Sequence, residues 1–320
     1  MELNVTCVQK AEGVSGLLVA NAPCSYGAFE DTVGVQEGLP EPEQVLDHIA
    51  ACGYDGTDLG PLGWVGDGPK VADALLSRGL ALAGGYLEMP FSELELMDDA
   101  MLDLDRLLEV FEAVASSNPP EVRPTPTLAD GGSPIRRANP GRAHVDRQLG
   151  LDDAGWKRLA DGVTRARDRC GERGFEPTFH HHINSHVEAP WEIERVLELT
   201  DIELCLDTGH LLVGGGDPIQ GLLDWSDRIN HLHIKDCRTD VVQVIVHELE
   251  PSDEIWRRHA FCRLGDGDLG VDAFLAGVQE LGFTGWMVVE QDGILDEVWP
   301  LDRAFEDQAA NRAYLRARGL

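Results

Sequence analysis

A single (β/α)8 barrel over residues 1–320, an α/β fold, is the architecture that the sequence predicts. Short apolar runs that are typical of buried parallel strands alternate with segments of helical periodicity, and eight such pairs follow one another. No linker divides the chain, and single barrels reach this length. The competing open, doubly wound sheet would need a Gly-rich phosphate turn after the first strand, where the sequence reads NAPCS.

Strands are expected where apolar residues run together between turn or helix signals. In chain order these ranges are 17–24, 54–59, 80–87, 122–128, 175–182, 202–206, 229–234 and 286–290. Pro124 and Pro126 make the fourth range the weakest, because proline cannot donate a hydrogen bond in a strand ladder.

Helices are expected where apolar side chains recur every three to four residues. In chain order these ranges are 41–52, 69–78, 97–117, 152–173, 191–199, 271–281 and 300–318, with a short helix between the sixth and seventh strands. Residues 129–150 are expected to form a long loop, residues 238–268 are expected to be irregular, and residues 1–10 are a candidate for an added strand.

The overall composition excludes some classes of protein. A formal net charge of −31 disfavours binding to nucleic acid, because an acidic surface repels phosphates. No run of 18 apolar residues occurs that could span a membrane, and we expect no signal peptide. The 7 Cys are scattered, which predicts reduced thiols and a cytoplasmic location.

Polar side chains gather where several predicted strands end. Asp207, His233 and Glu290 follow three different strands, and in a parallel barrel these ends meet at one mouth. Imidazole and carboxylate groups together are ligands that Mn, Co, Fe or Zn accept. The sequence therefore predicts a divalent-metal site at the mouth, although single members of the set could instead support a neighbouring ligand.

Strand alternation sorts the histidines. His180 and His182 point to one side of their strand and His181 to the other, and His231 and His233 likewise share a side. One His of each pair can be a ligand while its neighbour binds substrate or supports the ligand.

Other residues are candidates for substrate contact or catalysis. Lys235 could hold a substrate oxygen or transfer a proton, or else form a surface ion pair with Asp236. Glu188 is a candidate acid/base, or a carboxylate at a helix start. Asn21 and Tyr86 stand at strand ends, where Tyr86 could line the pocket with Trp64 and Phe91 or simply pack. The loop arginines that could clamp an anion, or lie solvated, are Arg136, Arg137 and Arg142.

Several motifs resemble a known group of proteins. LDTGH at 206–210, HLHIKD at 231–236, GDGDLGVDAFL at 265–275 and GWMVVEQD at 285–292 resemble the xylose isomerase-like TIM-barrel superfamily of sugar isomerases, epimerases and dehydratases. NAPCSYG at 21–27 and FHHHINSHVE at 179–188 look most like its inosose (2-keto-myo-inositol) dehydratase branch.

The resemblance implies a divalent metal, often Mn or Co, with Zn, Fe or Mg as further options. The matching ligand positions are Asp207, His233 and Glu290, and His180 stands where the superfamily usually has a Glu. Glu188 matches the loop Glu that often serves as acid/base, and His210 matches a substrate-contacting His. The expected metal set is His180, Asp207, His233 and Glu290; the expected catalytic residues are Glu188, Glu290 and Lys235; the expected substrate contacts are His182, His210, Asn21 and Tyr86.

The resemblance also implies a reaction in which a carboxylate removes the proton beside a carbonyl of a keto-polyol or keto-sugar. Dehydration of an inosose-like substrate is the favoured outcome, and isomerisation or epimerisation is the alternative. A non-catalytic sugar-binding barrel and an endonuclease IV-like nuclease are less favoured, the latter because of the acidic charge. A homo-oligomer is left open.

Overall fold

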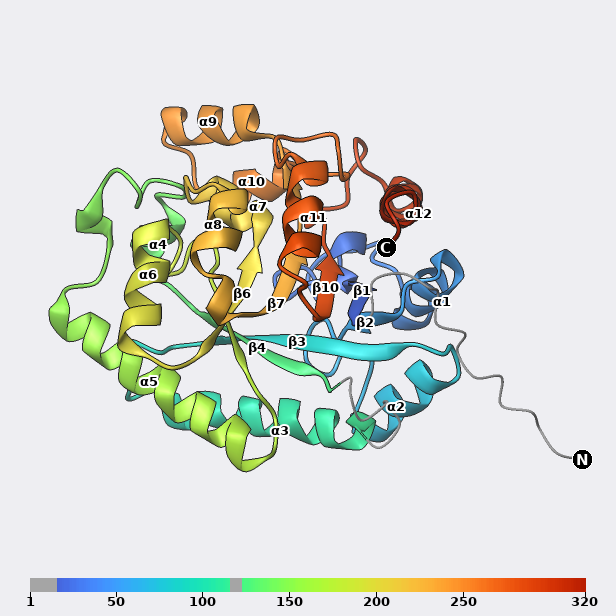
Figure 1. Ribbon diagram of the computed structural model, residues 1–320, viewed down its shortest axis with the longest axis horizontal. Coiled ribbons are helices and arrows are strands. Elements are labelled where there is room, and N and C mark those ends of the chain that lie inside the picture. The colour runs from blue at the N-terminus through green and yellow to red at the C-terminus, as the bar shows by residue number, and fades with distance from the viewer. Residues whose placement is uncertain (1–15, 116–122) are drawn as a thin grey trace, which may run out of the picture.

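A closed barrel of eight parallel strands forms the centre of the molecule (Figure 1), in a computed structural model that describes residues 16–115 and 123–320. The strands follow the order β1-β10-β7-β6-β5-β4-β3-β2 around the barrel. Their bounds are β1 Leu17–Asn21, β2 Gly56–Asp58, β3 Ala81–Met89, β4 Thr125–Asp130, β5 Thr178–His180, β6 Glu203–Asp207, β7 Ile229–Ile234 and β10 Gly285–Val289. The predicted fold class is confirmed, and a single domain over residues 1–320 stays a prediction.

Helices between the strands cover the outside of the barrel (Figure 1). Their bounds are α1 Pro42–Cys52, α2 Gly68–Leu76, α3 Met97–Ala115, α4 Pro134–Arg137, α5 Asp153–Glu172, α6 Pro190–Leu199, α7 Thr208–Val213, α8 Pro218–Asp224, α9 Thr239–Glu248, α10 Asp253–Arg257, α11 Val271–Glu280 and α12 Leu301–Arg316. Sequence signals set their ends. Asp152 caps α5 by accepting a hydrogen bond from the Gly155 amide at 2.7 Å, and Gly53 ends α1 in the left-handed conformation with φ 74°.

One expectation about the connecting segments was wrong. The range 238–268 is not irregular: it contains α9, α10 and β9 Phe261–Cys262, which pairs antiparallel with β8 Asp236–Cys237 just before this range. The loop over 129–150 contains the short α4 and a 3-10 turn, Arg147–Leu149. Two further 3-10 turns are η1 Pro23–Tyr26 and η3 Ser226–Arg228. The strand proposed for residues 1–10 lies outside the described residues.

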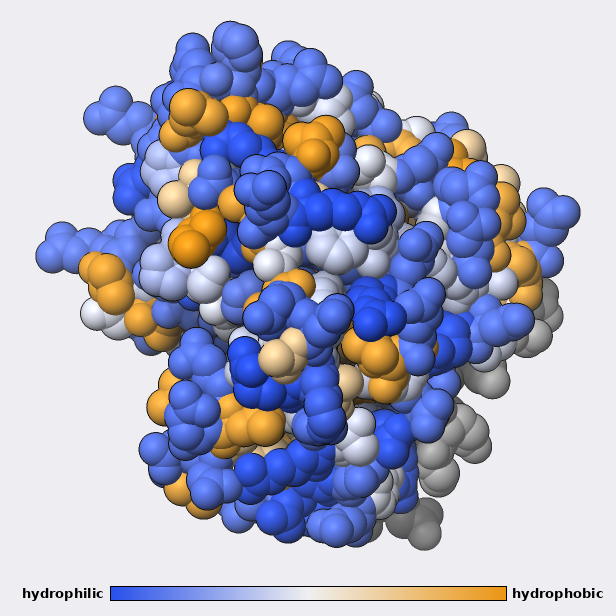
Figure 2. Space-filling model, turned by 90° about the vertical axis from the view of Figure 1, so that its left-hand side faces the viewer, coloured by the Kyte–Doolittle hydropathy of each residue, from blue (hydrophilic) through white to orange (hydrophobic). Residues whose placement is uncertain are grey.

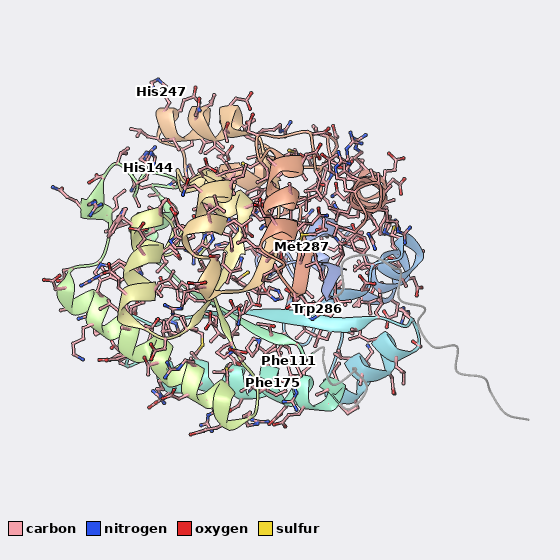
Figure 3. The ribbon with its side chains drawn as sticks, viewed as in Figure 1. Phe111, His144, Phe175, His247, Trp286 and Met287 are labelled. Atoms are coloured by element: carbon pink, nitrogen blue, oxygen red, sulfur yellow. The ribbon has the colours of Figure 1, made fainter. Side chains whose placement is uncertain are left out.

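The hydrophobic core has two layers at the barrel, and a separate cluster packs α9 and α10 against Ile183 and Phe261. The larger layer lies between the strands and the helices, where Phe111 of α3 packs edge-on against Phe175 with ring centroids 5.6 Å apart (Figure 3). The smaller layer fills the barrel interior around Trp286. Gly56 makes room there, because a Cβ at this position would come within 2.7 Å of the Trp286 ring.

Strand register brings the polar residues of the mouth together. Asp207 of β6 pairs with His233 of β7, and His233 pairs with Val288 of β10. Because alternate residues face the same side of a strand, Glu290 points to the same side as Val288, toward His233. The backbone hydrogen bond from the Glu290 amide to the Ile234 carbonyl, 3.1 Å, extends this pairing beyond β10.

The visible surface in Figure 2 is mostly hydrophilic, with small separate hydrophobic patches, as expected for a net charge of −31. Within residues 16–115 and 123–320, no helix is long and apolar enough to cross a membrane.

Candidate active site

Four predicted metal ligands lie together at the mouth of the barrel. His180, Asp207, His233 and Glu290 each offer a ligand atom, and these atoms all lie within 4.8 Å of one another. They come from β5, β6, β7 and the residue after β10, and all four side chains are buried. The carboxyl ends of four strands thus supply the group, as the sequence predicts.

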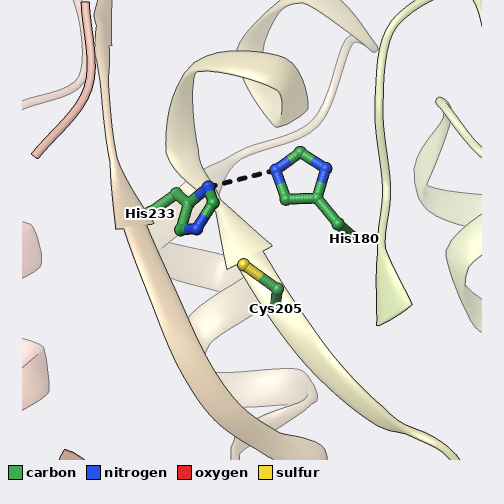
Figure 4. Close-up of side chains that lie close together, drawn as sticks. All are labelled: His180, Cys205 and His233. Carbon is green, nitrogen blue, oxygen red and sulfur yellow. Dashed lines mark hydrogen bonds between the residues drawn. The ribbon is translucent and has the colours of Figure 1, made fainter. Parts of the chain in front are cut away.

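The distances define one centre between the four side chains. His180 Nε2 lies 3.2 Å from His233 Nδ1 (Figure 4) and 3.4 Å from Asp207 Oδ2, while His233 Nδ1 lies 3.1 Å from Glu290 Oε2. The side chain of Cys205 lies beside the two histidines and forms an alternative three-residue group with them.

The four residues fit a divalent cation. Two imidazole nitrogens and two carboxylate oxygens converge, which is a donor set that zinc, manganese, cobalt and iron accept. Asp207 Oδ2 is buried and makes no hydrogen bond among the described residues, although Lys235 Nζ lies 3.2 Å from it. Because buried carboxylate oxygens need partners, a cation between these groups would add a coordination partner for this atom beside the ion pair with Lys235.

Lys235 supplies a positive charge to the same cluster. Its Nζ lies 3.2 Å from Asp207 Oδ2, 2.9 Å from Glu290 Oε2 and 2.8 Å from Asp292 Oδ2. Burial alone would lower the pKa of Lys235, but Asp207, Asp292 and Glu290 hold it well above its ordinary value. The side chain is therefore a buried ammonium group.

The alternative placement of Lys235 in a surface ion pair with Asp236 was wrong. Lys235 is only 1% exposed, so it does not lie at the surface. Asp236 makes its contacts with backbone amides and not with Lys235. The Asp236 carboxylate accepts hydrogen bonds from the backbone amides of Gly265, Gly267 and Leu269, and of its neighbour Cys237. Asp236 therefore fixes the loop that carries the GDGDLG sequence.

Burial raises the pKa of two carboxyl groups near the cluster, and of these Asp58 reaches a pKa of about 6. Asp292 likewise has a pKa raised by burial, against the opposing charge of Lys235. For Asp207, burial alone would raise the pKa, but Lys235 and His210 bring it well below its usual value. The carboxyl groups of the cluster thus differ in pKa: Asp58 and Asp292 take up a proton more readily than usual, and Asp207 less readily.

Three of the four predicted substrate contacts, His182, His210 and Tyr86, line one side of the cluster. The rings of His182 and His210 lie 4.0 Å apart between centroids, and the Tyr86 ring lies 5.6 Å from His180. His210 Nε2 is 3.0 Å from Lys235 Nζ. Burial lowers the pKa of His182 to about 3 and that of His210 well below its ordinary value, so both rings are neutral at pH 7. A neutral imidazole can donate to or accept from a substrate hydroxyl.

The alternation predicted for the three consecutive histidines is seen in their contacts. His180 contacts the centre, whereas His181 Nε2 accepts a hydrogen bond from the backbone amide of Asp207 at 3.1 Å. His181 therefore holds the end of β6, next to the ligand that this strand supplies.

Asn21 lies outside the cluster, against its predicted role in substrate contact. Its amide group donates to the Val289 carbonyl at 2.8 Å and to Gln308 of α12 at 3.0 Å. Asn21 pairs with Val289 in the ladder, and Val289 belongs to the core layer between the strands and the helices. The side chain therefore points away from the mouth and joins β1 to α12.

Glu188 is buried beside an arginine, and among the described residues it makes no hydrogen bond or ion pair with the four-residue centre. Its carboxylate accepts hydrogen bonds from the amides of Gly141 at 2.7 Å and Asn184 at 3.1 Å, and lies 3.8 Å from Arg136. Arg136 forms a two-pronged ion pair with Glu192, at 2.9 and 3.0 Å. Burial raises the pKa of Glu188 to about 7 and outweighs the opposing charge of Arg136 and the hydrogen bonds from Asn184 and Gly141.

The three loop arginines do not form an anion clamp. Arg136 is buried in its ion pair with Glu192, and Arg137 donates to the Gly131 carbonyl at 3.3 Å. Arg142 donates to Asn139 and to the Val246 carbonyl, at 2.8 and 2.6 Å. These contacts hold the long loop against α6 and α9. The positive charges of the loop sequence alone do not reveal these contacts.

Asp292 and Cys24 are residues of the mouth to which the sequence-based selection assigned no role. Asp292 contacts Lys235, and Cys24 forms a potential ligand group with Glu290 and Asp292. Strand alternation could have indicated Asp292, since it stands two residues after Glu290 and faces the same side. No local signal marks Cys24, because its neighbours at the mouth come from the other end of the chain.

A closed parallel barrel with polar ligands at the carboxyl ends of its strands is the architecture of an α/β-barrel enzyme. The chain belongs to the xylose isomerase-like TIM barrel family, whose model matches residues 132–313. The matched range contains all four residues of the centre.

Curated relatives cover most of the chain. An inosose dehydratase of Geobacillus kaustophilus (strain HTA426) is 31% identical over 283 residues, which are 87% of this chain and 88% of that protein. An inosose dehydratase of Lacticaseibacillus casei is 28% identical over 268 residues, 78% of this chain and 82% of that protein. The chain is thus similar over nearly its whole length to enzymes of this name.

Solved structures share the fold at lower identity. The IOLI protein, crystallised with a bound zinc atom, has a TM-score of 0.68 and 12% identity, and the match covers 95% of this chain and 99% of that one. A D-allulose 3-epimerase from Methylomonas sp. has a TM-score of 0.66 and 14% identity, covering 95% and 98%. These likenesses concern the fold.

Proposed function

We propose that the chain is a divalent-metal-dependent dehydratase of an inosose-like keto-polyol. The observation that carries the proposal is the convergence of His180, Asp207, His233 and Glu290 beside the buried ammonium of Lys235. The similarity to curated inosose dehydratases supports the substrate class. Isomerisation or epimerisation of a keto-sugar is the alternative, because it begins with the same proton removal.

The four residues of the centre would hold the metal. When bound, a divalent ion supplies Lewis-acid polarisation of a substrate carbonyl, which acidifies the neighbouring C–H bond. Manganese or cobalt is our first choice, and zinc or iron also suits two imidazoles and two carboxylates. Magnesium fits less well, because it prefers oxygen ligands.

The remaining steps belong to side chains. Lys235, as a buried ammonium, donates a hydrogen bond to a substrate oxygen and can give a proton to the leaving hydroxyl, which departs as water. A carboxylate must accept the C–H proton, and Glu290, which contacts both His233 and Lys235, is our candidate. His182, His210 and Tyr86 would contact substrate hydroxyls, because they line the same side of the mouth.

A cytoplasmic location is also proposed, supported by free thiols at all six described cysteines. The acidic charge of −31 supports a small-molecule substrate over nucleic acid.

The deciding experiment is a product assay on metal-depleted protein with keto-inositols and ketoses, with Mn²⁺ or Co²⁺ added back. We expect an ultraviolet-absorbing, dehydrated product from a keto-inositol, formed only when metal is present. A rearranged sugar without loss of water would favour the isomerase alternative. No turnover and no bound metal would instead indicate a barrel that only binds its ligand.

Glu188→Gln tests two properties of the loop carboxylate. If Glu188 is an acid/base, the turnover of the variant per bound metal should fall while its metal content stays the same as in the wild type. If Glu188 instead only anchors the loop through Gly141 and Asn184, turnover per metal should change little. Loss of metal at unchanged turnover per metal would contradict both readings.

The same variant should change how stability depends on pH. The pKa of Glu188 is about 7 in the folded protein, above its ordinary value of 4.5, so the folded state binds this proton more tightly. Relative to the Gln variant, the wild type should lose up to about 3 kcal/mol of unfolding free energy as pH rises from about 4.5 through about 7. Urea titrations at several pH values measure this difference, and a difference independent of pH would contradict it.

A further inference from the structure

A second group of potential metal ligands shares Glu290 with the first. Cys24, Glu290 and Asp292 each offer a ligand atom, and these atoms lie within 4.8 Å of one another. Cys24 is half-buried, and Glu290 and Asp292 are buried. The group therefore stands beside the four-residue centre at the same mouth.

Hydrogen bonds across the seam between β1 and β10 hold the three side chains in place. The Gln291 amide donates to Ser25 Oγ at 3.0 Å, and Ser25 Oγ donates to the Val289 carbonyl at 3.4 Å. Cys24 precedes Ser25, while Glu290 and Asp292 stand on either side of Gln291. The contacts thus fix the thiol next to both carboxylates, although the two segments are far apart in the sequence.

Asp292 presents an unused oxygen atom. Its Oδ2 contacts Lys235 Nζ at 2.8 Å, whereas its Oδ1 is buried without a hydrogen-bond partner among the described residues. The Asp292 side chain is only 9% exposed, so water does not easily satisfy this atom. Burial and the charges of Glu290 and Asp292 raise the pKa of the neighbouring Cys24 thiol well above its ordinary value, so a cation here would displace the thiol proton and supply the missing partner.

We propose that Cys24, Glu290 and Asp292 form a second cation position, selective for a thiophilic divalent ion such as Zn²⁺ or Cd²⁺. A thiolate sulfur favours these ions over Mn²⁺ and Mg²⁺, which prefer nitrogen or oxygen ligands. Formation of the sulfur–metal bond releases the thiol proton to solvent, so no oxidant or reductant is needed.

A divalent ion at this position would lie next to the buried ammonium of Lys235, which contacts Glu290 Oε2 at 2.9 Å and Asp292 Oδ2 at 2.8 Å. This ion would share the oxygen atoms that Lys235 now contacts, so it should inhibit an enzyme that works with Mn²⁺.

The test is a titration of the metal-depleted full chain with Cd²⁺, followed by thiolate-to-cadmium absorption and by bound metal after desalting. Cys24→Ser should remove one bound Cd²⁺ per chain and its absorption, while Mn²⁺ binding stays unchanged. Cys52→Ser is the matched control, since Cys52 is also half-buried but lies beside His48. Cys24→Ser should lower Cd²⁺ binding by the same amount in the wild type and in Cys52→Ser.

Asp292→Asn separates a built site from a lone thiol, because it keeps Cys24 and removes one charged ligand. We expect Cd²⁺ affinity at the Cys24-dependent position to fall at least about tenfold. Unchanged Cd²⁺ affinity in this variant, or unchanged Cd²⁺ content in Cys24→Ser, would overturn the proposal. Failure of the wild type to bind Mn²⁺ would instead count against the four-residue centre.

Discussion

Asp207→Asn is expected to lose bound metal and to lower turnover about 1000-fold, because the metal supplies several kcal/mol and each ~1.4 kcal/mol is a factor of ten in rate. Asp207 lies at the point where His180, His233 and Lys235 meet, with its Oδ2 within 4.0 Å of each. The Asn side chain can still accept the hydrogen bond that Asp207 receives from the His210 amide at the start of α7. The fold should therefore survive, as circular dichroism and metal analysis would show.

Asp217→Asn is the matched control, since Asp217 also caps a helix, α8, but is exposed and lies outside the centre. Its turnover and metal content should match the wild type. Near-normal turnover in Asp207→Asn, with the fold intact, would contradict the assignment of the centre. Glu290→Ala should behave like Asp207→Asn, because it removes another of the four proposed ligands.

Asp236→Ala is expected to lower the unfolding free energy by about 3 kcal/mol, because buried amides that lose their acceptor are costly to leave unsatisfied. The fully buried carboxylate accepts hydrogen bonds from the amides of Gly265, Gly267, Leu269 and Cys237. Gly267 packs so closely that a Cβ there would come within 2.4 Å of Asp236 Oδ1. Urea denaturation of the two proteins measures the difference.

Asp266→Ala is the control for the same loop. Asp266 forms an exposed ion pair with Arg263 at 3.0 Å, and such pairs contribute little to stability. Its unfolding free energy should therefore stay within about 0.5 kcal/mol of the wild type. Equal stabilities for the Asp236 and Asp266 variants would mean that the amide contacts of Asp236 do not hold the loop.

The barrel could be predicted because several of its strands are short apolar runs. Residues 286–289 of β10, Trp-Met-Val-Val, are apolar on both faces, and the helices between the strands repeat their apolar residues with helical spacing. The helix α9 was missed for the opposite reason. Its sequence TDVVQVIVHE is rich in β-branched residues, which favour strands, and only Val242 and Ile245 are buried. Tertiary packing of α9 in the separate cluster with Trp256 and Phe261 overrides that preference.

Site residues could be predicted where strand alternation determines the direction of a side chain. Contacts between segments far apart in the sequence could not be predicted. The type and direction of Asp207, His233 and Glu290 follow from their places at strand ends. Lys235 is buried among carboxylates that come from other strands and lie far from it in the sequence. A pattern within one short segment does not reveal this contact. The ion pair between Arg136 and Glu192 likewise joins a loop to a helix 56 residues away.

Closure of the barrel between β1 and β10 sets the order in which the centre can be completed during synthesis. β1 emerges from the ribosome first and finds its partner β10 only when the last strand has been made. His180, Asp207 and His233 are present earlier, and Glu290 follows directly after β10. A nascent chain that lacks β10 therefore carries three of the four donors and an open β1 edge, so completion of the four-donor centre depends on the strand that closes the barrel.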